Sequence, residues 1–147
     1  MLAVLIGVII LMLAVPSVSG LFAEQRLQKS FDRFDDLVRQ AQERSMTERR
    51  AYVLGWQKEA IVLRPEVLKG DDDEDLEVAR LSCDDGEAFS VTFPAALEKK
   101  PDPVWVFWPS GTCEPALIAY EGKAGKWTAN YDPLTVRGSF EVKITGP

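Results

Sequence analysis

The chain opens with an uninterrupted apolar stretch that stops where charged residues begin. Residues 1–23 carry no charged side chain, and residues 1–15 are apolar throughout. A helix over residues 1–23 would be about 34 Å long at 1.5 Å per residue, and a bilayer core is about 30 Å thick. The pattern therefore predicts a membrane-crossing helix, in which Pro16 introduces a kink.

A cleaved signal peptide is the alternative interpretation of this stretch. Signal peptides have a shorter apolar region that ends in small residues, as Val18, Ser19 and Gly20 would provide. They also begin with a basic segment, whereas only Met1 precedes this apolar run. We therefore favour a retained helix. The residues expected to pack in the membrane or in an assembly are Leu2, Val4, Leu5, Ile9, Leu13 and Pro16.

An amphipathic helix is predicted to continue directly from the apolar one. Apolar or small residues recur at spacings of three or four from Leu27 to Ser45, and charged residues fill the other faces. The stripe is too short for a typical coiled coil, and the sequence after it resembles strands. We expect the stripe to pack on a sheet of the same chain through Leu27, Phe31, Phe34, Val38 and Ala41.

From Ala51 onward the hydrophobic period becomes that of β-strands. Residues 51–56 and 60–63 predict a hairpin, and residues 104–108 are apolar on both faces, as in a buried central strand. Further strands are expected within residues 87–93, 116–120, 126–131 and 140–144. About six antiparallel strands packed on one helix predict an α+β fold.

The 147 residues thus divide into one head on a stalk. We expect residues 1–23 to be the membrane or filament-core half of a long N-terminal helix. Residues 24–50 would be its amphipathic half, and residues 51–147 a β-rich head.

The net charge of −6 comes mainly from the acidic run of Asp71 to Asp75. No basic patch is present to neutralise phosphates, so nucleic acid is not expected as a partner. The run lacks the alternating spacing and the distal glutamate of an EF-hand loop. We expect a solvated loop there, and no metal site.

The sequence offers little for enzymatic chemistry. It contains no histidine, which removes the commonest general base and metal ligand, so we expect neither catalysis nor a cofactor. Cys83 and Cys113 are the only cysteines, and they do not form a CxxC motif. In an oxidising compartment they can form a disulfide, and two buried thiols are the alternative.

Four features together resemble type IV pilin-like proteins, most closely the H-type minor pseudopilins of bacterial type II secretion. The first is the apolar helix with Pro16 that runs into an amphipathic half. The second is the segment 37–45, which is similar to the family's leucine-x-arginine-x-alanine-arginine-serine helix. The turn at 107–112 and the strand with Trp127 followed by the turn at 131–137 are the third and fourth.

The resemblance departs from the family pattern in two places. The leader glycine, the phenylalanine-threonine-leucine that follows it and the mature helix's glutamate are missing, so we expect the true start to lie upstream of Met1. Prepilin cleavage and methylation would then occur upstream as well. In the last turn, Val136 stands where the family has glycine.

The resemblance implies a pilin-like fold and a structural subunit of a secretion pseudopilus or a type IV pilus. It would be a single-pass inner-membrane protein with its head in the periplasm, and it would assemble with other pilin-like subunits, with secreted cargo and assembly-platform proteins as further partners. A membrane-anchored periplasmic binding module and a secreted β-rich domain remain as alternatives.

Overall fold

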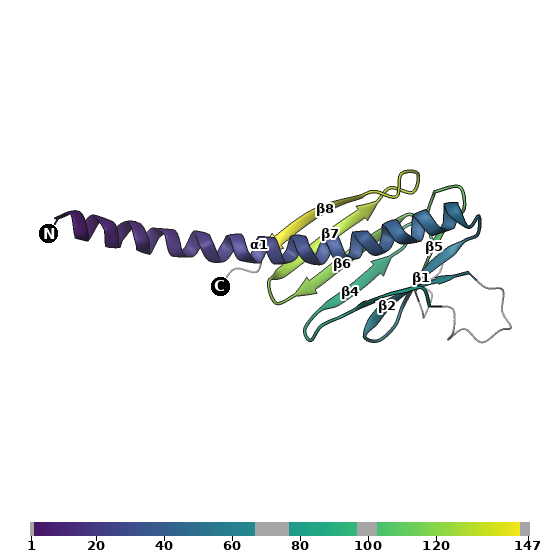
Figure 1. Cartoon of the computed structure of the whole chain (residues 1–147), viewed down its shortest axis with the longest axis horizontal. Coiled ribbons are helices and arrows are strands. Elements are labelled where there is room, and N and C mark those ends of the chain that lie inside the picture. The colour runs from purple at the N-terminus through teal and green to yellow at the C-terminus, as the bar shows by residue number, and fades with distance from the viewer. Residues whose placement is uncertain (1, 67–76, 97–102, 145–147) are drawn as a thin grey trace.

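A computed structural model of the chain describes residues 2–66, 77–96 and 103–144, with the side chains of residues 2, 10–19 and 144 left out. One long helix is followed by strands that form the head (Figure 1). The elements are α1 (Leu2–Thr47), β1 (Tyr52–Trp56), β2 (Ala60–Pro65), β3 (Ala79–Ser82), β4 (Ala88–Thr92), β5 (Val104–Phe107), β6 (Ala116–Gly122), β7 (Gly125–Tyr131) and β8 (Gly138–Ile144).

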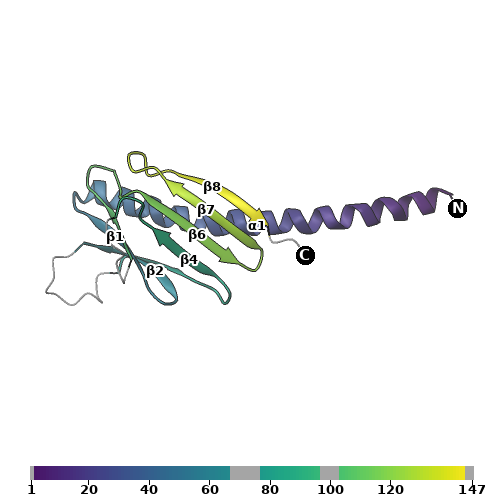
Figure 2. The same ribbon diagram turned by 180° about the vertical axis from the view of Figure 1, so that it is seen from behind.

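Helix α1 is continuous over 46 residues, and only its C-terminal half lies against the head (Figures 1 and 2). The helix ends where Arg49 adopts a left-handed backbone conformation with a φ of 54°. The Arg50 N–H then donates to the Ser45 carbonyl oxygen at 3.2 Å, which satisfies one of the last free carbonyls of the helix.

One sheet has the strand order β3-β2-β1-β5 and is antiparallel throughout. The hairpin of β1 and β2 is confirmed, with Leu54 opposite Leu63. The prediction of a central strand at residues 104–108 was wrong, because β5 is an edge strand of this sheet. Among the described strands it pairs with β1, and on its other side it makes only an isolated antiparallel bridge between Phe107 and Cys113. Its apolar character arises because Trp105 and Phe107 are fully buried, whereas Trp108 lies beyond the strand and is 42% exposed.

The second sheet has the strand order β4-β6-β7-β8 and lies under α1. Alternate residues of β7 are buried, so Trp127, Ala129 and Tyr131 share the inner face as predicted. The strands β6 and β7 are longer than expected and pair as far as Gly122 and Gly125, so the turn between them is short.

The core lies where α1 meets both sheets. Phe34 is fully buried, and its ring lies 6.4 Å from that of Trp105 on one sheet and 5.7 Å from that of Phe89 on the other. Phe31 stacks on Phe140 of β8 at 4.3 Å. One aromatic stripe of α1 therefore closes the space between the two sheets.

The α+β fold with a long N-terminal helix on antiparallel strands is confirmed. The described part of the head forms two four-stranded sheets, where a single sheet of about six strands was expected. The strand β3 was not predicted, because it is only four residues long and includes Arg80 and Ser82 on its exposed face. Among the residues whose side chains are described, no helical segment is long and apolar enough to cross a membrane.

Candidate functional site

The N-terminal half of α1 projects from the head and carries an unpartnered apolar surface. Of the residues predicted to pack in a membrane or an assembly, Val4, Leu5 and Ile9 are 71%, 64% and 51% exposed. The side chains of Leu2, Leu13 and Pro16 lie outside the described residues. Exposed apolar side chains grouped in this way, as in the described residues 3–9, are typical of a binding surface.

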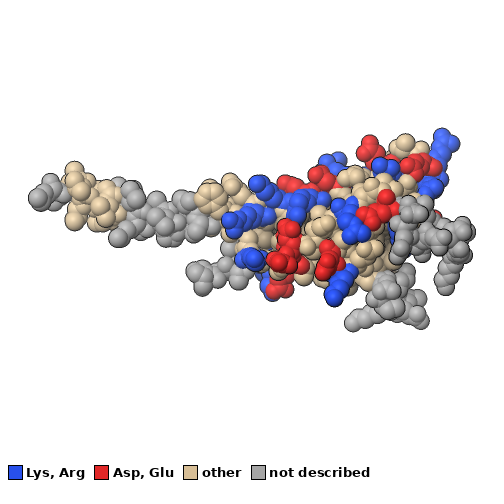
Figure 3. Space-filling view, turned by 60° about the horizontal axis from the view of Figure 1, so that its bottom comes forward, with Lys and Arg blue, Asp and Glu red and all other residues tan. Residues whose placement is uncertain are grey.

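Charged side chains are confined to the other part of the molecule. Figure 3 shows lysine, arginine, aspartate and glutamate gathered over the head and the C-terminal half of α1, while the described part of the projecting half has none. Nearer the head, Leu21 and Phe22 are also apolar, and both are more than half exposed.

The residues predicted to pack the helix on the sheet are all at the helix–head contact. Leu27, Phe34, Val38 and Ala41 are almost completely buried, and Phe31 is 8% exposed. All five belong to the main core cluster. The helix therefore leaves the head at Leu27. We call residues 27–30 the exit turn.

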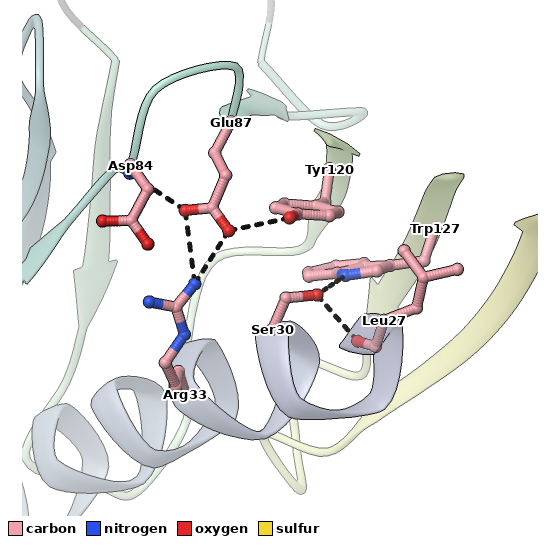
Figure 4. A network of polar contacts seen from close by, with 7 residues as sticks. All are labelled: Leu27, Ser30, Arg33, Asp84, Glu87, Tyr120 and Trp127. Atoms are coloured by element: carbon pink, nitrogen blue, oxygen red, sulfur yellow. Dashed lines mark hydrogen bonds and ion pairs between the residues drawn. The ribbon is translucent and has the colours of Figure 1, made fainter. Parts of the chain in front are cut away.

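A short chain of hydrogen bonds connects the exit turn to β7 (Figure 4). The Trp127 indole N–H donates to the Ser30 hydroxyl oxygen at 2.8 Å, and the Ser30 hydroxyl donates to the Leu27 carbonyl oxygen at 2.7 Å. Ser30 is 3% exposed, so this hydroxyl is a buried polar group that is satisfied both as a donor and as an acceptor. We call this chain the Trp127–Ser30–Leu27 relay.

Glu87 holds the next turn of the helix from the loop before β4 (Figure 4). Its carboxylate accepts hydrogen bonds from Arg33 at 3.0 Å, from the Tyr120 hydroxyl at 2.8 Å and from the Asp84 backbone N–H at 3.0 Å. Burial raises the pKa of Glu87, but these hydrogen bonds and the charge of Arg33 outweigh burial and hold the pKa below its ordinary value. Burial and the Glu87 carboxylate raise the pKa of Tyr120 to about 12.

Further polar contacts follow the helix to its far end. Tyr131 donates to Asp35, and Ser45 donates to the carbonyl oxygens of Gln42 and Trp108 at 2.7 and 3.2 Å. Ser45 is completely buried. Sequence reasoning placed Ser45 on the buried stripe but missed Ser30 and Glu87. Ser30 could have been found from its spacing, because it is an uncharged residue three positions after Leu27 and therefore lies on the same helix face.

A groove of about 670 Å³ lies between α1 and the residues that precede and open β8. Asp35, Arg39 and Gln42 line it from the helix, and residues 135–138 line it from the head. Asp35 is already bound by Arg39 at 2.9 Å and by Tyr131. No group of three potential metal ligands occurs within the described residues, and the run from Asp71 to Asp75 lies outside them.

Cys83 and Cys113 are free thiols in the structure. Cys113 is buried, and burial raises its pKa to about 12. Burial and the nearby Glu87 carboxylate also raise the pKa of Cys83. Both shifts favour the protonated thiol at neutral pH.

No protein-family model and no curated protein matches this sequence. Among solved structures, the chain is similar to the minor pseudopilin EpsH from the Type 2 Secretion System of Vibrio cholerae. The two share 11% sequence identity and a TM-score of 0.53, over 82% of this chain and 98% of the other. The fold is therefore pilin-like and pseudopilin-like, which confirms the resemblance at the level of the fold.

Proposed function

We propose that this protein is a non-enzymatic structural subunit of a type II secretion pseudopilus or a type IV pilus, and that it assembles through its N-terminal helix. One observation carries the proposal: a pilin-like head holds a continuous helix whose projecting half is apolar in sequence, and whose described apolar side chains there are exposed. A monomer that exposes such a surface to water would be unstable or would aggregate. The surface therefore needs either lipid or other helices around it.

Both environments have a place in the proposed function. Before assembly, residues 1–23 would hold the subunit in the inner membrane with its head in the periplasm. On assembly this half would leave the lipid and pack among the helices of other pilin-like subunits. The transfer exchanges one apolar environment for another, so its outcome depends on how well the helices pack and not on burial from water.

A photo-crosslinking scan of the projecting half would test the proposal. A photoreactive amino acid is placed in turn at each position from Ala3 to Ile9 in the full-length chain in its native host. Adducts with other pilin-like subunits should vary along the scan with a period of about 3.6 residues, because only one face of a packed helix contacts a given neighbour. The same probe at Leu134, which is 77% exposed on the head, is the control for random collision.

The scan separates the proposal from its main alternative. A permanent lipid anchor for a binding module would give lipid adducts at all positions and no adducts with pilin-like subunits. That result would overturn the proposed function. Fractionation of the same cells tests the membrane stage separately, since the unassembled subunit should sediment with the inner membrane.

A further inference from the structure

We propose that Ser30 is a positioning residue that fixes the direction in which the projecting half of α1 leaves the head. The importance of Ser30 for assembly rests on the proposed function. The inference is carried by the Trp127–Ser30–Leu27 relay, which joins a rigid strand of the head to the backbone of the exit turn (Figure 4).

The relay acts on the helix backbone itself. The Leu27 carbonyl accepts the Ser30 hydroxyl at 2.7 Å, and a serine bonded to a carbonyl one turn earlier commonly bends a helix. Trp127 of β7 sets the position of the Ser30 hydroxyl, because the Trp127 indole N–H donates to the oxygen of that hydroxyl. The geometry of the exit turn is thereby coupled to the sheet through two short hydrogen bonds.

Trp127 is itself held firmly in place. It is 1% exposed, and its ring packs against those of Phe31 at 5.3 Å and Tyr120 at 5.4 Å. Tyr120 is in turn bonded to Glu87, which also binds Arg33 one turn further along α1. The donor that positions Ser30 therefore belongs to a rigid, aromatic part of the core.

Apolar packing alone would fix this direction less well. Among the described side chains on the N-terminal side of Ser30, Leu27 is the only buried apolar one. An apolar contact is non-directional, so Leu27 can hold the helix close to the sheet without defining its tilt. Hydrogen bonds depend steeply on angle and can define it.

Ser45 supplies a matched control at the other end of the contact. It is buried like Ser30, and it too donates to the carbonyl three residues earlier and contacts the head. The two serines differ in place, because Ser45 lies at the end of α1 that is far from the projecting half. Loss of Ser45 should weaken the fold but leave the direction of the projecting half unchanged.

The test measures that direction in the full-length chain in detergent micelles. Spin labels are attached to cysteines at Phe22 and Leu134, after Cys83 and Cys113 have been replaced by alanine. Both label sites are more than half exposed. The distance distribution should be narrow with Ser30 present and should become clearly broader or shifted in S30A/W127F. It should stay narrow in S45A.

Thermal unfolding separates positioning from general stability. S30A leaves the buried Trp127 N–H without its acceptor, and S30A/W127F removes both partners but leaves a cavity where the indole was, so both thermal midpoints should fall. S45A also loses a buried hydroxyl, and its thermal midpoint should fall while the direction of the projecting half stays fixed. The direction of the projecting half relative to the head should be poorly defined in both S30A and S30A/W127F. In the crosslinking assay, S30A/W127F should lose adducts several-fold and S45A should not.

A distance distribution in S30A/W127F identical to that of the parent chain would overturn the inference. So would an equal broadening in S45A, because the effect would then be general loosening of the contact. The distance measurement does not depend on assembly. If the parent chain gives no adducts at all, the proposed function fails while the positioning role of Ser30 can still be judged.

Discussion

At the residue scale, the contact between α1 and the head depends on a few buried or half-buried polar groups in addition to apolar packing. The Glu87 carboxylate is the clearest case, since it accepts four hydrogen-bond contacts from the helix, from β6 and from its own loop. A carboxylate in this setting stabilises the fold only while it is ionised. The helix–head contact is therefore sensitive to acid at a known position.

We expect E87Q to lower the free energy of unfolding by about 1 kcal/mol at pH 7, because charge-assisted hydrogen bonds become neutral ones. The pKa of Glu87 is lowered in the folded state, so its contribution is present above the ordinary value of 4.5 and is lost as the pH falls below it. The difference between E87Q and the parent should thus shrink as the pH is lowered below 4.5 in urea denaturation experiments.

The matched control is E121Q, which alters an exposed glutamate paired only with Lys126 among the described contacts. Its effect on the free energy of unfolding should stay below about 0.5 kcal/mol. A difference between E87Q and the parent that is the same at every pH would contradict the role assigned to the Glu87 carboxylate.

At the element scale, the sequence predicted the elements better than their arrangement. The helix and most strands could be predicted from the spacing of apolar residues, because each of these elements has one regular buried face. The edge position of β5 could not be predicted, since a strand apolar on both faces looks the same in the centre of a sheet and at an edge covered by other residues. Here the backbone N–H of Glu114 bonds to the Val106 carbonyl oxygen, and the Glu114 carbonyl accepts the Trp105 indole N–H.

The contacts at the exit turn could not be predicted either, because they join residues far apart in the sequence. Ser30 and Trp127 are separated by 97 positions. The stripe that contains Leu27 and Phe31 predicted which helix face is buried, but not which strand receives it. The hydrogen-bond partners of the helix residues depend on which strand packs against them and on the register of that strand. The hydrophobic period of the sequence determines neither.

The turn before β8 shows how one element tolerates an unfavourable residue. Val136 has a φ of 56°, a conformation that suits glycine and strains a β-branched residue. The Asp132 carboxylate accepts the backbone N–H groups of Leu134 and Thr135, and its carbonyl accepts that of Val136. The turn thus keeps the geometry expected of glycine, and the Val136 side chain is buried in return.

We expect V136G to change the free energy of unfolding by less than about 1 kcal/mol, because relief of about 1–2 kcal/mol of strain offsets the lost burial. The same change at Val62, a buried residue of β2, relieves no strain and should cost at least about 2 kcal/mol. Chemical denaturation of both variants would check this. An equal loss in V136G and V62G would show that the turn stores no strain.

At the scale of the whole molecule, one helix unites two sheets whose described strands do not pair with each other. Phe34 contacts rings from both, including Trp56 and Trp105 on one sheet and Phe89 and Trp127 on the other. The head is therefore organised around the same helix that projects from it. Folding of the head and placement of the projecting half are coupled through this residue.

We expect F34A to lower the free energy of unfolding by about 3–5 kcal/mol, since a fully buried ring is replaced by a cavity between the sheets. F22A, which alters an exposed ring on the same helix, should change it by less than about 0.5 kcal/mol. Tryptophan fluorescence and near-ultraviolet circular dichroism in urea would measure both. A small effect of F34A would mean that the sheets are stable without the helix.

The course of β8 decides where this protein can be tagged. The strand runs back toward the exit turn, and Ile144 pairs with Gly125 beside the start of β7 (Figure 1). A fluorescent reporter fused after Ile144 would be attached at the side of the head from which the helix emerges, where it could obstruct neighbouring molecules. An insertion at Ser110, exposed in the turn that Gln42 binds near the opposite end of the head, keeps such a reporter away from that side.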